Sequence, residues 1–271
     1  MRIIIKENYT NNIPVLSISP EKEKLKPLVI YIHGYGATKE QGIDFGYKMA
    51  KLGFVFISFD CMEHGEREKI KTQSKYKKFE PVYPPDTGID TYVHMHEVIV
   101  QTQKDINIII DKLQSHPQID TSRIGLTGFS MGGFATFYNA AYCDYIKAAA
   151  PIAGKPAFKK AWDDIILSTS TYKQWSAKIK NLKYETESRT AFIKKIDPYQ
   201  DIFAFAPKPL LIINGDQDID QPHIYSLKLY KELLPYYQVD PEKLRLSMPF
   251  TGHCLTDDIK KEICDWFNKY L

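Results

Sequence analysis

Continuous apolar runs alternate with amphipathic stretches along most of the chain. An unbroken apolar run indicates a strand that is covered on both faces, as in a parallel sheet. Two earlier segments, residues 2–6 and 13–19, are separated by turn-forming residues and predict an antiparallel edge ahead of the main sheet. The runs that predict covered strands are residues 28–32, 54–59, 124–129, 148–152, 210–213 and 244–248.

The amphipathic stretches between these runs predict helices. Their apolar residues recur at helical spacing, so that one face of each helix can cover the sheet. The predicted helices occupy residues 43–50, 95–113, the stretch after Ser130, the stretch opened by Pro222, and residues 256–270. Strands that alternate with helices indicate an α/β fold with a mostly parallel central sheet and helices on both faces.

Two segments interrupt this alternation. Residues 61–91 form a long irregular stretch rich in Pro, Tyr and Lys, and a loop of that length within a compact domain is usually functional or mobile. Residues 155–206 carry many aromatic side chains but no clear strand pattern. We interpret the chain as one domain, residues 1–271, with residues 155–206 as an inserted cap or lid.

The sequence around Ser130 predicts a nucleophile. It reads Gly128-Phe129-Ser130-Met131-Gly132-Gly133 and lies between a predicted strand and a predicted helix. The chain must reverse there within a few residues, which places Ser130 on a strained turn with its hydroxyl exposed at the strand end. A Gly-x-Ser-x-Gly pattern also arises by chance, but a strand before it and a helix after it are the required context.

A serine nucleophile needs a base and a group that orients the base. His253 is the best candidate base, because it follows the last predicted strand by a short loop and precedes the last helix. His33 also ends a strand, but the glycine after it favours a role in shaping the turn. The other candidates, His116 and His223, lie at helix ends and are interpreted as solvated or capping residues.

The orienting acid is expected in the loop after residues 210–213. Asp216, Asp218 and Asp220 compete there, and each could instead cap a local turn. Whichever is chosen, the chain order is serine, aspartate, histidine, which differs from the orders in the chymotrypsin and subtilisin folds.

Composition narrows the functional classes. The 271 residues are 44% hydrophobic with a net charge of +3, and no run approaches the roughly 20 apolar residues of a membrane span. No basic helix or RNA-binding signature is present, so we expect no nucleic-acid partner. The N-terminus does not read as a signal peptide, and the 4 cysteines lack Cys-x-x-Cys spacing. We therefore expect free thiols and a cytoplasmic location.

The segment His94-Met95-His96-Glu97 raises the alternative of a metal site. On a helix, however, positions i and i+2 point to different sides, so the two imidazoles would diverge. We favour an ordinary boundary between loop and helix at this segment, with neither a metal nor an organic cofactor.

These motifs together resemble the α/β-hydrolase superfamily, in the branch of dienelactone hydrolases and prolyl oligopeptidase-like enzymes, and within it the small bacterial YitV-type esterases. The resemblance covers residues 28–154 and 209–270 but not the segment between them. The matching motifs are His33-Gly34, Asp60 with His64-Gly65-Glu66-Arg67, Asp120 to Gly125 leading into Gly128–Gly133, Gly215-Asp216-Gln217-Asp218, and Gly252-His253.

The resemblance implies roles for particular residues. In that family the acid lies three residues beyond the strand-end glycine, which favours Asp218 over Asp216, with Asp220 as the next candidate. The backbone N–H groups of Tyr35 and Met131 correspond to the oxyanion hole. An N–H at the start of the helix after Ser130 is also where a developing negative charge needs a donor. Dienelactone hydrolases proper use a cysteine nucleophile, so Ser130 argues against their substrate here.

The expected function is a serine hydrolase that cleaves carboxylic esters of small molecules through an acyl-enzyme on Ser130. The alternatives are a peptidase or amidase, a thioesterase, or a non-catalytic binding protein on the same fold. Substrate contacts are predicted from Arg67, which could instead pin its own loop, and from Trp162 and Trp175, which could instead pack the cap. A homodimer is a further expectation.

Overall fold

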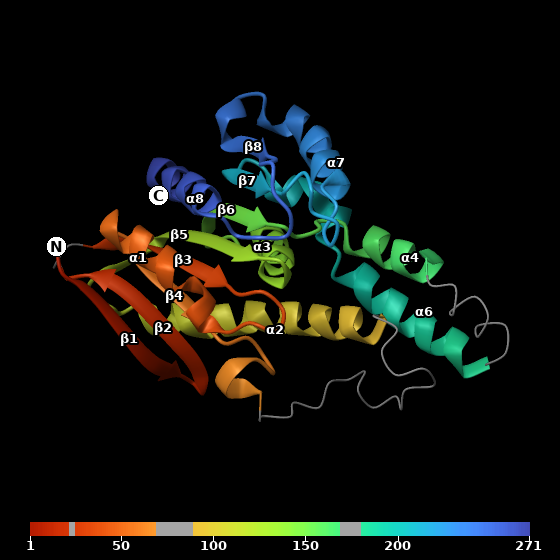
Figure 1. The fold of residues 1–271 in the computed structure, drawn as a ribbon, viewed down its shortest axis with the longest axis horizontal. Coiled ribbons are helices and arrows are strands. Elements are labelled where there is room, and N and C mark those ends of the chain that lie inside the picture. Colours follow the sequence, from red (N-terminus) through yellow and green to blue (C-terminus); the bar gives the residue numbers. More distant parts are fainter. Residues whose placement is uncertain (22–24, 69–88, 169–179) are drawn as a thin grey trace.

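The computed structural model describes residues 1–21, 25–68, 89–168 and 180–271. Within them, the strands form one sheet in the order β1-β2-β4-β3-β5-β6-β7-β8 (Figure 1). β2 pairs antiparallel with β1 and with β4, whereas the remaining neighbours pair in parallel. The prediction of a mostly parallel sheet with an antiparallel edge is confirmed. The strands are β1 (Ile3–Thr10), β2 (Ile13–Pro20), β3 (Lys26–Ile32), β4 (Val55–Phe59), β5 (Ile119–Phe129), β6 (Ile146–Ile152), β7 (Leu210–Ile213) and β8 (Leu244–Ser247).

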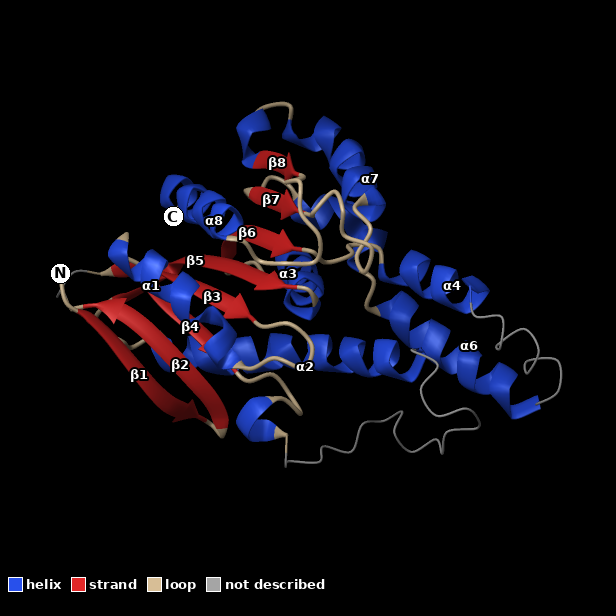
Figure 2. Cartoon of the chain, viewed as in Figure 1, coloured by secondary structure: helices blue, strands red, loops and turns tan. Residues whose placement is uncertain are grey.

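Helices cover both faces of the sheet (Figure 2). α1 and α8 contribute to one apolar cluster, and α2, α3 and α7 contribute to the cluster on the opposite face. The α-helices are α1 (Ile43–Lys51), α2 (Ile89–Leu113), α3 (Met131–Tyr142), α4 (Phe158–Ser168), α6 (Lys180–Lys195), α7 (Ile224–Leu233) and α8 (Asp257–Tyr270). The shorter 3-10 helices are η1 (Lys39–Gly42), η2 (Gly65–Arg67), η3 (Pro198–Phe205), η4 (Leu234–Tyr237) and η5 (Pro241–Lys243).

β3 shows why the covered strands read as continuous apolar runs. Leu28, Ile30 and Ile32 belong to the cluster with α2 and α3, whereas Val29 and Tyr31 belong to the cluster with α1 and α8. Successive side chains of a strand point to opposite faces, and here both faces are buried. An apolar residue is therefore favoured at every position.

Some elements are longer than the sequence pattern predicts. β1 and β2 pair over their full length around a tight turn in which Asn11 and Asn12 have φ of 47° and 65°. β1 continues to Thr10, past its predicted end at residue 6. Residues 7–9 are exposed, so a pattern based on burial did not mark them. α2 begins at Ile89 and therefore contains His94 and His96. The predicted boundary between loop and helix at these histidines is wrong.

The described part of residues 155–206 is helical and consists of α4, α6 and η3. α4 and α6 lie beyond the carboxyl ends of the strands (Figure 1). Asp197 follows α6 and caps the start of α4, because its carboxylate accepts hydrogen bonds from the backbone N–H groups of Phe158 and Lys159 at 3.0 and 3.1 Å. Among the described residues, no helix is both long and apolar enough to cross a membrane.

Candidate active site

Ser130 occupies the sharp turn between β5 and α3. Its φ is 56° and its ψ is −115°, a conformation that costs on the order of 1–3 kcal/mol for a residue other than glycine. The Ser130 N–H donates to the carbonyl oxygen of Ile152 at 2.9 Å, and its own carbonyl accepts from the Phe134 N–H at 3.1 Å. The turn is thereby tied both to the neighbouring strand β6 and to the helix that it opens.

The glycines on either side of Ser130 permit a close approach of backbone segments. A Cβ atom at Gly132 would lie 2.0 Å from the carbonyl oxygen of Ile32, at the end of β3. A Cβ atom at Gly128 would lie 2.6 Å from the backbone of Gly132. Any side chain at these two positions would force β3, β5 and α3 apart.

Asp218 and His253 form a close pair. Asp218 Oδ2 lies 2.7 Å from His253 Nδ1, with the aspartate side chain fully buried and the histidine side chain 22% exposed. The second carboxylate oxygen of Asp218 accepts from the backbone N–H groups of Asp220 and Gln221 at 3.0 and 2.8 Å. Among the three competing aspartates, Asp218 is the residue whose carboxylate is hydrogen-bonded to His253, whereas Asp216 is only partly buried and Asp220 is exposed.

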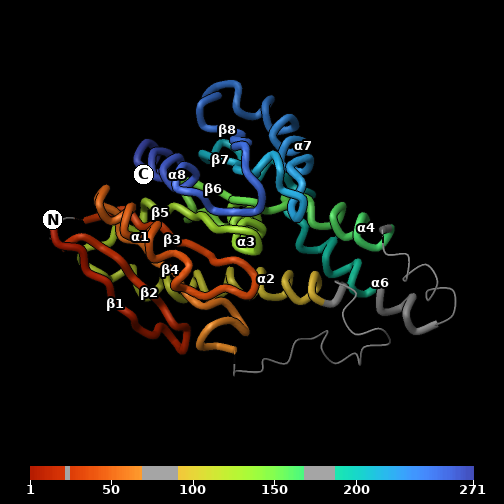
Figure 3. The backbone as a smooth tube through the Cα atoms, in the orientation of Figure 1, coloured from red at the N-terminus to blue at the C-terminus, as the bar shows by residue number. Residues whose placement is uncertain are grey.

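The loop that carries His253 packs against the loop that carries Asp218. The Asp216 N–H donates to the carbonyl oxygen of Pro249, and the Gln217 N–H donates to that of Thr251. The His253 ring also packs at a tilt against the ring of Phe129, the residue before Ser130, with the ring centroids 4.8 Å apart. Figure 3 shows the segment between β8 and α8 running past the ends of β6 and β5. The imidazole thus contacts the buried carboxylate and, through its ring face, the residue that precedes Ser130.

The loop after β3 adjoins Ser130 on another side. A Cβ atom at Gly34 would lie 3.7 Å from the Cβ atom of Ser130. The Gly34 N–H donates to the side-chain oxygen of Gln41 at 2.9 Å and is thus already engaged. The next backbone N–H along the loop is that of Tyr35. Met131 is the first residue of α3, where backbone N–H groups lack partners within the helix. The two predicted oxyanion donors thus belong to segments that meet at Ser130.

His33 fastens the same loop to the loop after β4. Its ring is buried, and its Nε2 accepts a hydrogen bond from the Cys61 N–H at 3.0 Å. Burial lowers the pKa of His33 to about 4, which keeps the ring neutral and able to accept. This agrees with the turn-shaping role that its position before Gly34 predicted.

Arg67 pins its own loop. Its Nη1 donates to the carbonyl oxygen of Asp60 at 3.0 Å and to the Asp105 carboxylate of α2 at 2.5 Å. The carboxylate of Asp60 is itself buried and accepts from the backbone N–H groups of Lys39 and Glu66. These contacts favour the alternative role of Arg67, in pinning its own loop, over the predicted substrate contact.

Trp162 is also a packing residue. Its side chain is fully buried, its ring stacks on Tyr92 of α2 at 6.0 Å, and its Nε1–H donates to Thr190 of α6 at 2.8 Å. The prediction that it contacts substrate is wrong, since it joins the helices of the inserted segment to the body of the protein. Trp175 lies outside the described residues.

His94 and His96 diverge, as residues two apart on a helix must. His96 is buried against Tyr92 and Phe158, and burial lowers its pKa to about 3. His94 instead points toward Tyr35, whose hydroxyl lies 3.2 Å from its Nδ1. The two imidazoles thus do not form a joint metal site.

Asp218, Asp220 and His253 form a cluster of possible metal ligands, with ligand atoms within 4.8 Å of one another. Both carboxylate oxygens of Asp218 already accept hydrogen bonds, one from His253 and the other from backbone N–H groups. Asp220 is exposed. This donor set fits a hydrogen-bonded Asp–His pair better than it fits a metal cage.

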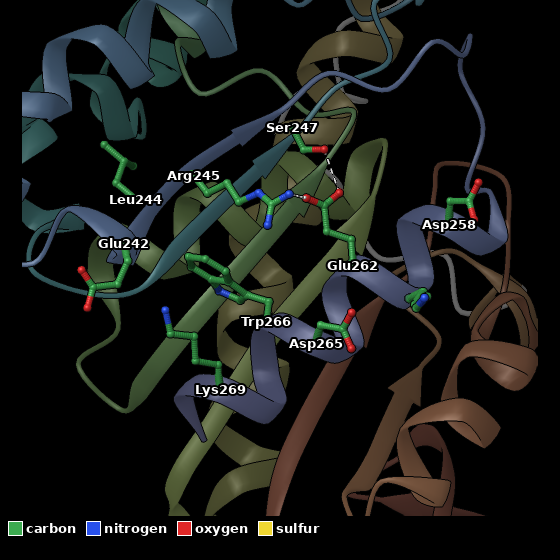
Figure 4. A pocket seen from close by; sticks show the side chains of 10 residues that line it. Glu242, Leu244, Arg245, Ser247, Asp258, Glu262, Asp265, Trp266 and Lys269 are labelled. Atoms are coloured by element: carbon green, nitrogen blue, oxygen red, sulfur yellow. Dashed lines mark hydrogen bonds and ion pairs between the residues drawn. The ribbon is translucent and has the colours of Figure 1, made fainter.

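A cavity of about 630 Å³ lies on the edge of the sheet between β8 and α8 (Figure 4). Within it, Glu262 lies 2.9 Å from Arg245 and accepts a hydrogen bond from Ser247 at 2.7 Å. None of Ser130, Asp218 and His253 lines this cavity, so we do not assign the chemistry to it.

Two features of the site escaped sequence reasoning. Gln41 holds the Gly34 N–H, and the hydroxyl of Tyr35 contacts His94, which in turn lies 3.0 Å from Glu63. No local pattern marks Gln41. The only available signal for His94 was its proximity to another histidine, and that signal pointed to a metal.

Two family models match the chain. The model of the dienelactone hydrolase family matches residues 13–182. The model described as BAAT / acyl-CoA thioester hydrolase C terminal matches residues 108–257. The two matches overlap at β5, Ser130 and α3, and between them they include the loops of Gly34, Asp218 and His253.

Individual proteins are similar over nearly the whole chain. "Putative esterase YitV" of Bacillus subtilis (strain 168) is 26% identical over 274 residues, which cover 98% of each chain. The crystal structure of TT1662 from Thermus thermophilus has a TM-score of 0.73 at 19% identity and covers 100% of this chain and 98% of that one. Acetyl xylan esterase 1 from Thermoanaerobacterium sp. has a TM-score of 0.64 at 16% identity, covering 99% and 88%. At these identities the two solved structures establish a shared fold.

Proposed function

The chain belongs to the dienelactone hydrolase family, and we propose that it is a serine hydrolase that cleaves carboxylic esters of small molecules. The observation that carries the proposal is the pair of Asp218 and His253, 2.7 Å apart, with the His253 ring against the residue before Ser130. A strained serine turn, an imidazole and a buried carboxylate are the parts that acyl transfer requires.

In the proposed acylation step, the Ser130 Oγ attacks the ester carbonyl carbon while His253 Nε2 removes the hydroxyl proton. Asp218 accepts the hydrogen bond from Nδ1–H, which keeps Nε2 unprotonated and stabilises the imidazolium that forms. The tetrahedral intermediate then collapses, the C–O bond of the ester breaks, and His253 gives its proton to the departing alkoxide. The products are an alcohol and an acyl-enzyme on Ser130.

The backbone N–H groups of Tyr35 and Met131 are the proposed oxyanion donors. The loop of Gly34 and the first turn of α3 both adjoin Ser130, which supports this assignment. Losing one such donor lowers the rate by about 10²- to 10³-fold, or about 2.7–4 kcal/mol. Each donor is a backbone group on a fixed element, so no reorganisation is needed when the charge develops.

Deacylation repeats the same chemistry with water. His253 takes a proton from water, the hydroxide adds to the acyl carbon, and the Ser130 Oγ leaves with the proton that His253 returns. A carboxylic acid is released and the serine is regenerated. The proposed reaction needs neither a metal nor an organic cofactor.

Thioesters are the second candidate substrate class. The match to the acyl-CoA thioester hydrolase model over residues 108–257 favours them, because it includes the residues of the proposed triad. Esters remain the first proposal, since the relative that is 26% identical carries an esterase name. We place the substrate at the carboxyl ends of the strands, with the segment that contains α4 and α6 as the proposed cap.

A fluorophosphonate probe tests the proposal directly. We expect the wild-type protein to be labelled and Ser130→Ala, with an unchanged fold by circular dichroism, to be unlabelled. Hydrolysis of p-nitrophenyl esters, a thioester and an anilide by both proteins then separates esterase, thioesterase and amidase. A folded wild type that neither takes the probe nor turns over any of these substrates would favour a non-catalytic binding protein.

A further inference from the structure

A chain of three side chains joins the loop after β3 to α2 and to the loop after β4. The Tyr35 hydroxyl lies 3.2 Å from His94 Nδ1, and His94 Nε2 lies 3.0 Å from the carboxylate of Glu63. The side chains of His94 and Glu63 are only 14% and 10% exposed, so water competes little for these contacts. The carboxylate favours a proton on Nε2, which leaves Nδ1 to accept a hydrogen bond from the phenol.

Aromatic contacts fix the phenol ring from another side. The ring of His64 lies 5.2 Å from that of Tyr35 in an edge-on arrangement and 5.1 Å from that of His33. His64 is itself buried and contacts the carbonyl oxygen of Met62 through Nδ1 at 2.8 Å. The side chain of Tyr35 is therefore held by His94 of α2 and by His64 of the loop after β4, although 44% of the residue is exposed.

The contacts of the phenol add to hydrogen bonds that already hold the backbone at Tyr35. Gly34 and Gly36 flank it, and Gly36 has a φ of 75°. Glycine has the greatest conformational freedom of any residue, so neither neighbour restricts the Tyr35 backbone by itself. Gln41 holds the Gly34 N–H. The Gly34 carbonyl, which shares a peptide with the Tyr35 N–H, accepts from the Ala37 N–H at 3.1 Å and lies 2.8 Å from His33 Nδ1. The contacts of the phenol restrain the same residue through its side chain.

We propose that Tyr35 is a positioning residue, whose phenol, held by His94 and Glu63, fixes the direction of its own backbone N–H toward the oxygen of the Ser130 adduct. This inference rests on the proposed function, because it concerns the same oxyanion hole. It assigns a role to three side chains that do not touch the reacting atoms. Their effect is expected in the transition state and not in ground-state binding.

The first test replaces the phenol hydroxyl alone. Tyr35→Phe is expected to lower kcat by about tenfold, a fraction of the loss that follows removal of a whole oxyanion donor, with KM for a neutral ester within about twofold of wild type. The inhibition constant of an alkylboronic acid, which forms a tetrahedral adduct on Ser130, should rise by the same factor as kcat falls. Tyr47→Phe, an exposed tyrosine on α1, is the matched control and should change neither quantity.

The second test concerns the partner of the phenol. His94→Gln keeps a hydrogen-bond acceptor and should retain more activity than His94→Leu, which keeps none. The double variant Tyr35→Phe/His94→Leu should lose no more than the stronger single variant, because both changes break the same contact. Thermal unfolding of each variant shows whether the loss of activity exceeds any loss of folded protein.

Several outcomes would overturn the inference. These are an unchanged kcat and boronate affinity in Tyr35→Phe, equal activities of His94→Gln and His94→Leu, additive losses in the double variant, or losses that match the unfolded fraction. A wild type without Ser130-dependent hydrolysis would sink the proposed function and this inference with it. A wild type that is active and a Tyr35→Phe variant that equals it would sink this inference alone.

Discussion

Replacing Asp218 by asparagine separates its proposed catalytic role from its structural one. One carboxylate oxygen accepts hydrogen bonds from the backbone N–H groups of Asp220 and Gln221, and the other faces His253 Nδ1 at 2.7 Å. In Asp218→Asn, the two backbone donors keep the amide oxygen on their side, because reversing the amide would leave both unpaired at a cost of about 1–3 kcal/mol each. The amide NH₂ then faces His253.

This orientation reverses the tautomer of the imidazole. An NH₂ group at 2.7 Å requires Nδ1 to accept, so Nε2 carries the proton and cannot take another from Ser130. An equivalent change in a serine protease lowers kcat by about 10⁴-fold, or about 5.5 kcal/mol, and we expect a loss of that order. The midpoint of urea unfolding should change little, because the turn after β7 keeps its hydrogen bonds.

The assay is steady-state hydrolysis of p-nitrophenyl acetate, with fluorophosphonate labelling as a second readout of Ser130. Asp216→Asn and Asp220→Asn are the matched controls and should retain activity within about threefold of wild type, because neither carboxylate is hydrogen-bonded to His253. Near-normal activity in Asp218→Asn would refute the reasoning. So would an equal loss in Asp220→Asn.

Three other changes test the surroundings of the site. Gly132→Ala should lower activity by at least about 10²-fold and reduce Tm, because its Cβ would lie 2.0 Å from the Ile32 oxygen; an active, stable variant contradicts the close packing. Arg67→Met should lower the free energy of unfolding in urea by about 3 kcal/mol, because it leaves the buried Asp105 carboxylate without its ion-pair partner. The ratio of KM for anionic esters to KM for neutral esters should not change, whereas loss of a substrate clamp would raise it. Burial holds the pKa of His96 at about 3, below its unfolded value of 6.5. Between these two pH values the unfolded chain binds more protons than the folded one, so the free energy of unfolding falls as the pH drops. His96→Leu should flatten this pH dependence in unfolding measured near pH 7 and near pH 4, and an unchanged dependence would assign it to other groups.

The sheet and the serine turn could be predicted because their signals are local. Strands covered on both faces leave continuous apolar runs, and the turn at Ser130 requires glycines where backbones approach within a few ångströms. The helix start at Thr256 was equally predictable, since its side chain accepts from the Ile259 N–H as a helix cap. In each case the residue type follows from its immediate neighbours along the chain.

The partners of the polar side chains could not be predicted in the same way. The aspartate that meets His253 depends on how the loops after β7 and β8 stack, and spacing alone left three candidates. Arg67 could be interpreted as a substrate contact until Asp105 was found beside it. An aromatic side chain such as that of Trp162 is equally suited to line a pocket or to pack in a core. Its burial depends on α2 and α6, which are distant from it in sequence.

The inserted segment between β6 and β7 has a consequence for how this protein family can diversify. β6 and β7 are adjacent and paired, with Ala149 opposite Leu210 and Ile152 opposite Ile213, so the chain leaves and re-enters the sheet at neighbouring points. Lengthening a loop whose ends are already close costs only about 0.6 kcal/mol per doubling. The proposed cap can therefore be exchanged during evolution while the register of the strands beneath Ser130, Asp218 and His253 is kept.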